Sequence, residues 1–190
     1  MRKNKPIKPL LTPWGEALDK RKPLNDYPRP QLARKEWQCL NGAWDYAITA
    51  DKQMPKIWDG EIIPFSPETI LSNVQRQLLP GETLWYRKTF NFEQCKPEER
   101  LLLHFGAVDQ YCTVYVNGKE AGSHSGGYWP FSFDINNFLN SDTTEIVIAV
   151  TDDTDTGDEA YGKQTLNRGE IWYTGQSGIW QTVWCERVPA

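Results

Sequence analysis

The sequence predicts an all-β fold with little helix. The 190 residues include 9 Trp, 8 Tyr, 14 Gly and 13 Pro, a composition that fits short strands joined by tight turns. No segment keeps apolar residues at helical spacing over a long run. A chain of this length is sufficient for one domain with a substantial core.

The chain begins with a Pro-rich segment, residues 1–34, which we expect to lie extended across the sheets as a strap. Residues 35–190 then form the sheets themselves. The first strand follows the Asn41-Gly42 turn, where aromatic and apolar residues alternate from 44 to 48. Residues 61–70 read as short extended pieces, because prolines interrupt them.

Three later segments read as strands of different exposure. Residues 84–92 alternate, so that strand is expected to be half exposed. Residues 101–105 are apolar on both faces apart from His104, as in an inner strand. Ile146, Ile148 and Val150 lie on one face of the next strand, and residues 179–186 form the closing strand.

A β-hairpin is the clearest local signal. Residues 111–116 alternate and then meet Asn117-Gly118, the dipeptide best suited to two positive φ angles. Gly126-Gly127 follows and allows close backbone approach. An aromatic run over 128–133 then closes at Asp134, which is predicted to cap one helical turn over 135–139.

Composition excludes several classes of function. The formal charge is −4 without a dense Lys/Arg stripe, which argues against nucleic acid as a partner. The basic residues at positions 2–8 are expected to form a solvated arm. Prolines break any apolar signal-peptide core, and no stretch of about 18 apolar residues could span a membrane, so a cytoplasmic location is expected.

The cysteines are few, widely spaced and without the C-x-x-C spacing of a zinc site, so four free thiols are expected. Cys112 and Cys185 fall within strand patterns and are predicted to be buried as small hydrophobes.

Four blocks resemble the N-terminal sugar-binding domain of glycoside hydrolase family 2, the family of β-galactosidases, β-glucuronidases and β-mannosidases. They are LWYRKTF, HFGAVDQYCTVYVNGKEAGSHSGGYWPFSFDI, IVIAVTD and IWYTGQSGIWQTVW, within residues 84–151 and 171–188. TPWGEAL, YPRPQLARKEWQCLNGAWDYAI and IPFSPE resemble the leader of one bacterial branch. The resemblance implies a jelly-roll, galactose-binding-domain-like β-sandwich that helps to build a sugar site.

The resemblance also implies what else the enzyme contains. Relatives continue into an immunoglobulin-like domain and a catalytic barrel, whose two glutamates perform retaining hydrolysis of a β-linked sugar. A barrel needs about 250 residues, so the sequence is expected to be an excised domain without catalytic residue, cofactor or metal. The sugar itself is not fixed by these residues.

Two other functions stay open. One is a stand-alone carbohydrate-binding module or lectin, which would need its own complete concave site with exposed aromatics. The other is a purely structural domain that caps the barrel and mediates assembly, in which case the segment 152–170 would tolerate substitution.

The polar segment 152–170 is the main candidate for function, because structureless loops longer than about 12 to 15 residues are usually functional or disordered. Asp152 stands where a strand ends, so its carboxylate is expected to reach out and accept hydrogen bonds from sugar hydroxyls. The resemblance gives the V-T-D aspartate that role in the terminal-sugar subsite. The alternative is a turn-forming Asx residue.

The other acids of this segment, Asp153, Asp155, Asp158 and Glu159, are expected to form a solvated face. An EF-hand match fails, because Asp158 and Gln164 stand where that motif needs Gly and Glu. An irregular calcium site within 152–159 stays open as a second interpretation.

The aromatic and histidine side chains complete the candidates. Trp172 and Tyr173 belong to a loop and are proposed to meet the sugar or the missing domains. Trp180 and Trp184, on one face of the closing strand, are assigned to the core, and Trp129 to packing over the sandwich. The sequence places His104 and His124 in structural roles, since neither neighbours a nucleophile elbow or a metal-ligand pair.

Overall fold

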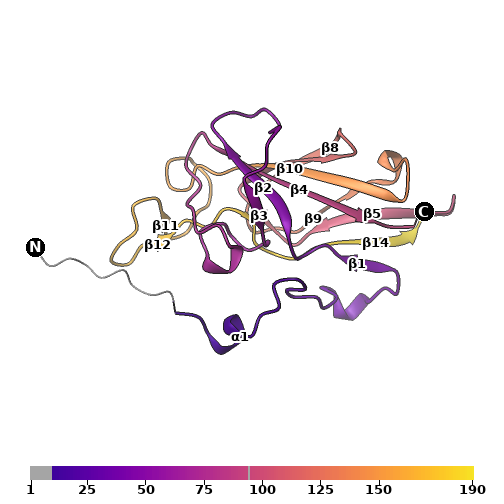
Figure 1. Ribbon diagram of the computed structural model, residues 1–190, viewed down its shortest axis with the longest axis horizontal. Helices are drawn as coiled ribbons and strands as arrows, with labels where there is room; N and C mark the ends of the chain where they lie inside the picture. Colours follow the sequence, from indigo (N-terminus) through magenta and orange to yellow (C-terminus); the bar gives the residue numbers. More distant parts are fainter. Residues whose placement is uncertain (1–9, 94) are drawn as a thin grey trace, which may run out of the picture.

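The computed structural model describes residues 10–93 and 95–190 and shows a β-sandwich of jelly-roll type with two main antiparallel sheets (Figure 1). The predicted all-β class is therefore confirmed. Six strands form one sheet in the order β3-β2-β4-β10-β7-β8, and four form the other in the order β1-β14-β5-β9. The predicted basic arm at positions 2–8 lies outside the described residues.

The strands of the two main sheets are short and joined by turns. The six-stranded sheet contains β3 (Gly60–Ile62), β2 (Trp44–Thr49), β4 (Thr83–Asn91), β10 (Thr143–Thr151), β7 (Tyr111–Val116) and β8 (Lys119–Ser125). The four-stranded sheet contains β1 (Trp37–Cys39), β14 (Val183–Pro189), β5 (Glu99–Phe105) and β9 (Phe131–Asp134).

Two small sheets lie beside the sandwich. The antiparallel one joins β13 (Gly178–Ile179) to β6 (Val108–Asp109), and the parallel one joins β11 (Gln164–Thr165) to β12 (Tyr173–Thr174). Within residues 10–93 and 95–190, helix is limited to α1 (Pro13–Glu16) and the 3-10 turns η1 (Pro30–Leu32), η2 (Ile70–Ser72) and η3 (Asn136–Phe138). None of these described helices is long and apolar enough to cross a membrane.

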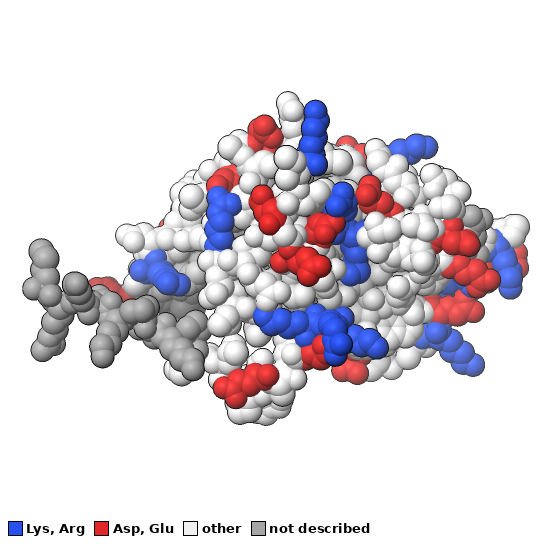
Figure 2. All heavy atoms as spheres, viewed as in Figure 1, with Lys and Arg blue, Asp and Glu red and all other residues white. Residues whose placement is uncertain are grey.

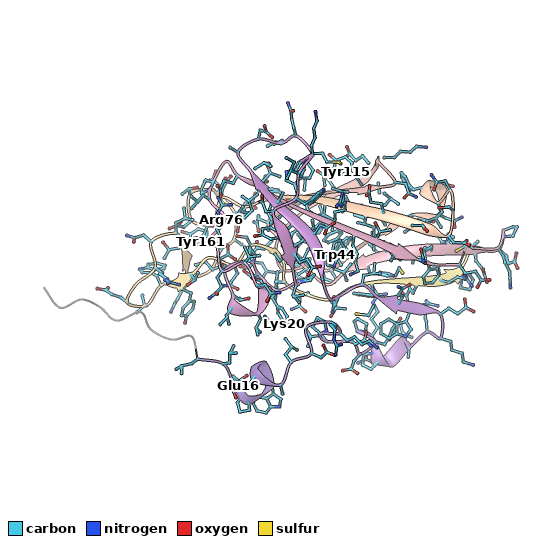
Figure 3. All side chains as sticks on the ribbon, viewed as in Figure 1. Glu16, Lys20, Trp44, Arg76, Tyr115 and Tyr161 are labelled. Carbon is cyan, nitrogen blue, oxygen red and sulfur yellow. The ribbon has the colours of Figure 1, made fainter. Side chains whose placement is uncertain are left out.

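The core lies between the inner faces of the two main sheets, where alternate strand residues meet. Trp44 is 1% exposed, and Figure 3 shows it in the interior. The first half of β4 was predicted to be half exposed, which is wrong, because Leu84, Trp85 and Tyr86 are all buried. Trp85 faces away from the core, but it packs with Trp58 of the β2–β3 connection in a second cluster.

The hairpin and the segment after it follow the sequence with one shift. β7 and β8 pair across Asn117 and Gly118, whose φ angles of 49° and 76° are those the turn requires. The predicted helical turn is the 3-10 turn η3. Asp134 ends β9 instead of capping the turn directly, although its Oδ1 still accepts a hydrogen bond of 3.0 Å from Asn136 N.

Residues 10–34 of the predicted strap run along the four-stranded sheet, below it in the view of Figure 1. These strap residues are anchored to the sheet through the carboxylate of Glu186 on β14, whose side chain is 1% exposed. Tyr27 Oη donates to Glu186 Oε2 over 2.6 Å, and Arg29 and Arg34 approach the same carboxylate at 3.7 and 3.3 Å. A buried carboxylate is thereby compensated by strap residues.

His104, on β5, faces the same carboxylate. Its Nε2 lies 2.9 Å from Glu186 Oε1, while Arg29 Nη2 lies 3.3 Å from Nδ1. A guanidinium only donates, so Nδ1 accepts and the imidazole is neutral. Burial lowers the pKa of His104 to about 4, with the positive charges of Arg29 and Arg34 acting in the same direction. The ring also stacks on Trp184 at 4.7 Å, which confirms a structural role.

The cysteines and the charged surface agree with the sequence. All four cysteines are free, and Cys112 and Cys185 are buried as predicted. On the face shown in Figure 2, most Lys and Arg side chains are interspersed with Asp and Glu, apart from one short run of adjoining blue side chains below the centre of the view.

Candidate functional site

The site is built at one end of the sandwich, where β10 stops at Thr151 and the segment 152–170 begins. Asp152 is buried there, with 6% of its surface exposed. Its Oδ1 accepts a hydrogen bond of 2.7 Å from Thr154 N, and its Oδ2 accepts one of 2.8 Å from Ser177 Oγ. The carboxylate was expected to reach out, but it points into the protein in the geometry of an Asx turn.

Two more carboxylates lie near Asp152. Ser177 joins Asp152 to Glu68, because its Oγ lies 3.1 Å from Glu68 Oε1 and its N donates to Glu68 Oε2 over 3.2 Å. Asp109, at the end of β6, is 5% exposed. Burial raises the pKa of Asp109 to about 7, and the charge of Asp152 adds to the shift. The sequence analysis missed this group of two buried acids, Asp109 and Asp152, and the half-buried Glu68, since Glu68 and Asp109 are far from Asp152 in the chain.

The space around Asp109 and Asp152 is small. It measures about 10 Å³, which is room for about one water molecule. Within the described residues, no three His, Cys, Asp or Glu side chains gather so that they could hold a metal ion. A sugar therefore has no room between these carboxylates.

The acids of the segment 152–170 divide into two groups. Asp153, Asp158 and Glu159 are exposed. Asp155 was predicted to be solvated too, but it accepts hydrogen bonds from Thr165 Oγ1 at 2.5 Å and Leu166 N at 3.2 Å, which lower its pKa. Glu159 accepts a bond from Tyr111 Oη. These contacts fold the segment back on the sandwich.

The same segment has secondary structure of its own, contrary to the expectation of a structureless loop. Gln164 and Thr165 form β11, which pairs with Tyr173 and Thr174 of β12. Gln164 Oε1 also accepts a bond of 2.6 Å from Gln176 N. Figure 1 shows this small sheet at the end of the molecule opposite the C-terminus, and Figure 3 places Tyr161 at the same end.

Trp172 and Tyr173 were assigned to a loop, but Tyr173 begins β12 and only Trp172 lies beside the small sheet; they are 46% and 64% exposed, respectively. They border an open groove of about 860 Å³. The groove is lined by Gln164, Arg168, Gly169, Trp172, Tyr173, Thr174 and Gln176. Arg168 is oriented by a bond of 2.8 Å from its Nη1 to Thr174 Oγ1. Exposed aromatic faces next to amide and guanidinium donors can take the apolar face and the hydroxyls of a sugar.

A second pair of exposed aromatics belongs to the same end. Trp129 was expected to pack over the sandwich, which is wrong, because it is 71% exposed. Tyr128 is 48% exposed, and its Oη lies 3.2 Å from Gln164 Nε2. Gln164 and Tyr128 are thus functional candidates that the sequence analysis missed. The Gly126-Gly127 pair before Tyr128 is the signal that could have indicated them.

Trp180 has a different place from the one predicted. The closing strand β14 begins at Val183, so Trp180 lies before it and Trp184 alone belongs to it. Trp180 Nε1 donates to Gly127 O over 2.8 Å, and its ring meets Tyr128 edge-on at 6.4 Å. Trp180 therefore packs against Gly127 and Tyr128 at the end of the sandwich that carries the exposed aromatics, instead of filling the core. His124, which was predicted to be structural, stacks on Phe131 at 4.0 Å.

Comparison with known proteins agrees with this architecture. Residues 69–189 match the family model described as "Glycosyl hydrolases family 2, sugar binding domain". The chain is 28% identical over 160 residues to a β-galactosidase of Bacteroides ovatus, an alignment that covers 84% of the chain and 16% of that enzyme. It is 32% identical over 105 residues to a putative β-glucuronidase of Formosa agariphila, covering 55% of the chain and 12% of the relative.

A solved structure shares the fold. The crystal structure of a β-glucuronidase of Bacteroides uniformis superposes with a TM-score of 0.58 at 26% identity, covering 81% of this chain and 18% of that one. The chain therefore spans less than a fifth of the length of these three relatives.

Proposed function

Because the chain belongs to glycosyl hydrolase family 2, whose sugar-binding domain matches residues 69–189, we propose that it serves a β-glycosidase. In that enzyme it helps to hold the terminal β-linked sugar. Two carboxylates on a catalytic barrel elsewhere in the polypeptide would perform retaining hydrolysis, one as acid/base and one as nucleophile. The partners proposed for this chain are thus the sugar and the remaining domains of its own polypeptide.

The groove beside β11 and β12 carries this proposal. Trp172 and Tyr173 present wide exposed aromatic faces there, and aromatic faces are costly to leave in water unless a ligand or another domain covers them. Arg168 and the side-chain amides of Gln164 and Gln176 supply hydrogen-bonding groups at its wall. A groove that is open on one side suits a site completed by another domain.

Asp152 has an indirect part in this proposal. Its two carboxylate oxygens accept hydrogen bonds from Thr154 N and Ser177 Oγ, so Asp152 ties the start of the segment 152–170 to the residue just before β13. In this role Asp152 is a positioning residue, and Trp172 and Tyr173 are the groups in contact with the sugar. A direct grip on a sugar hydroxyl by Asp152, as the sequence suggests, would require its carboxylate to turn out of these bonds.

The test uses the enzyme encoded by the complete gene and aryl β-glucuronide and β-galactoside substrates. Trp172→Ala and Tyr173→Ala are each expected to lower kcat/KM about 10-fold, the equivalent of about 1.4 kcal/mol, mainly through KM. Trp14→Ala is the matched control, because Trp14 is 81% exposed on the strap helix α1. Equal kcat/KM values for Trp172→Ala, Tyr173→Ala and Trp14→Ala would contradict the proposed site.

The stand-alone lectin is separated by titrating this 190-residue chain with glucuronic acid and galactose. An incomplete subsite should bind either sugar with a Kd of about 1 mM or weaker. Micromolar binding by calorimetry would favour the lectin and count against a domain that needs its barrel.

A further inference from the structure

The outer face of the six-stranded sheet carries a groove of about 830 Å³ that the proposed function does not use. This volume lies in the upper part of the range of small-molecule sites, about 300 to 1,000 Å³. The groove is lined by Lys52, Thr83, Trp85, Tyr111, Cys112, Thr113, Tyr115, Ser123, His124, Ser125, Ala149, Thr151 and Asp153.

The strand register explains why the sheet is hollow here. Trp85 on β4 is opposite Ala149 on β10, Ala149 is opposite Thr113 on β7, and Thr113 is opposite Ser123 on β8. Neighbours in such a row lie side by side on one face of the sheet. The small side chains of Ala149, Thr113 and Ser123 therefore form a shallow floor, and the larger ring of Trp85 closes the floor at the β4 end.

Two tyrosines flank this floor. Tyr111 and Tyr115 lie two residues before and after Thr113, so all three side chains share the outer face of β7. Figure 3 shows Tyr115 toward the edge of the molecule, over the six-stranded sheet, whereas Trp44 lies inside. Four residues of strand separate the tyrosines by about 13 Å, which leaves room for more than one ring between them.

The groove is rich in hydroxyl groups and nearly neutral. Thr83, Thr113, Thr151, Ser123 and Ser125 all line it. Its two charged side chains, Lys52 and Asp153, are of opposite sign. Thr83 is 1% exposed, and its Oγ1 has no hydrogen-bond partner among the described residues. An unsatisfied buried hydroxyl at the wall of a groove is a ready partner for a ligand hydroxyl.

We infer that this groove is a second carbohydrate site, which binds a neutral oligosaccharide along the sheet face; that this oligosaccharide is β-linked rests on the proposed function. Hydroxyls on the floor and wall would exchange hydrogen bonds with the sugar, and Tyr111 and Tyr115 would pack against its rings. The balanced charge of the lining favours a neutral chain over a polyuronate. An apolar protein partner fits less well, because the floor exposes more hydroxyls than hydrocarbon side chains.

This site differs in place and ligand from the one at Trp172 and Tyr173. None of the residues that line one groove lines the other. The sheet-face groove would hold the enzyme near a polysaccharide, whereas the terminal-sugar groove would act on the bond to be cleaved. Failure of either proposal leaves the other unaffected.

The experiment is a titration of this chain with cellotetraose, xylotetraose and β-1,4-galactotetraose, followed by amide NMR. At least one of the three is expected to bind with a Kd of about 1 mM or tighter and to shift amides of β7, β8 and β10. Thr113→Tyr fills the floor and should weaken that binding at least about 10-fold. Thr89→Tyr is the matched control, since Thr89 is exposed on the same face of β4 but outside the groove.

Three outcomes would overturn the inference. They are no saturable shifts with any of the three sugars, shifts confined to residues 164–176, and equal weakening by Thr113→Tyr and Thr89→Tyr. Unchanged melting temperatures of both variants establish that they are folded. If Thr113→Tyr unfolds the chain, Tyr115→Ala replaces it with Trp14→Ala as its control, because Trp14 is 81% exposed on α1 and lines neither groove, and only Tyr115→Ala should then weaken binding.

Discussion

Asp152 shows how one residue decides between two interpretations of the same sequence. The Asx geometry predicts that Asp152→Ala leaves Thr154 N without its partner and Ser177 Oγ with Glu68 as its remaining one, so the free energy of unfolding should fall by about 2 to 3 kcal/mol. For a chain of this size that is a drop in Tm of about 5 to 10 °C. Asp152→Asn keeps an acceptor for Thr154 N and should lose less than about 1 kcal/mol.

Thermal melting of both variants checks this prediction, together with kcat/KM in the complete enzyme. A positioning role predicts that kcat/KM and Tm fall together in Asp152→Ala and change little in Asp152→Asn. If Asp152→Asn melts like the wild type but loses kcat/KM by about 10-fold or more, the carboxylate contacts the sugar directly.

Asp109 makes stability depend on pH. Its folded pKa of about 7 lies above the usual value, so between about pH 4 and pH 7 the folded state holds a proton that the unfolded state has lost. The contribution of Asp109 to the free energy of unfolding is therefore complete below about pH 4 and is lost as the pH rises through 7.

Asp109→Asn should remove this dependence. Denaturant unfolding at intervals from pH 5 to 8 is expected to show wild-type stability falling relative to Asp109→Asn. His104 opposes the trend below pH 6.5, but it is common to both proteins and cancels in the difference. A constant difference across this range would place the pKa of Asp109 near its ordinary value.

At the scale of single elements, the turn between β8 and β9 depends on Gly127. A Cβ at this position would stand 2.2 Å from Asp109 Oδ1, a contact that cannot be kept. Gly127→Ala should therefore lower the free energy of unfolding by about 1 to 3 kcal/mol. Gly169→Ala is the control, because no atom lies within 4 Å of its added carbon. Chemical denaturation of the two variants gives the comparison, and equal stabilities would show that the turn adapts.

The strap depends on its bonds to Glu186. Tyr27→Phe removes the 2.6 Å bond from Tyr27 Oη to Glu186 Oε2 and should cost about 1 to 2 kcal/mol, since a hydrogen bond to a buried carboxylate is stronger than one between neutral groups. Tyr173→Phe removes the same hydroxyl from an exposed side chain and should cost nothing measurable. Melting temperatures test this, and limited proteolysis should cut residues 10–34 faster in Tyr27→Phe alone.

Elements were predictable where the signal is local. The alternation of residues 111–116 and the Asn117-Gly118 turn specify the β7–β8 hairpin within eight residues. Trp129 and Trp180 were misplaced because an aromatic residue has the same pattern in a core and at an exposed end. Ser177 and Glu68 are 109 residues apart in the sequence, so no local rule indicates that Ser177 Oγ contacts the carboxylates of both Glu68 and Asp152.

At the scale of the whole molecule, the chain contains the sandwich, and the two carboxylates that would perform hydrolysis are proposed to lie on a barrel elsewhere in the polypeptide. Asp109 and Asp152 are buried beside a space for about one water molecule, and Glu68 is half-buried next to Ser177. The 190-residue chain is therefore expected to release no nitrophenol from nitrophenyl β-glycosides above a protein-free control. Activity that is abolished by mutating one of these three acids would move the chemistry into this domain.

The place of β14 in its sheet has a consequence for biosynthesis. This strand spans Val183–Pro189 but lies between β1 and β5, two strands made far earlier. A ribosome releases the chain from its N-terminus, so the four-stranded sheet stays divided until β14 has left the exit tunnel. Until then β5 has an open edge that a neighbouring nascent chain could pair with. Chaperone protection during translation should therefore raise the yield of folded protein more than chaperones added after release.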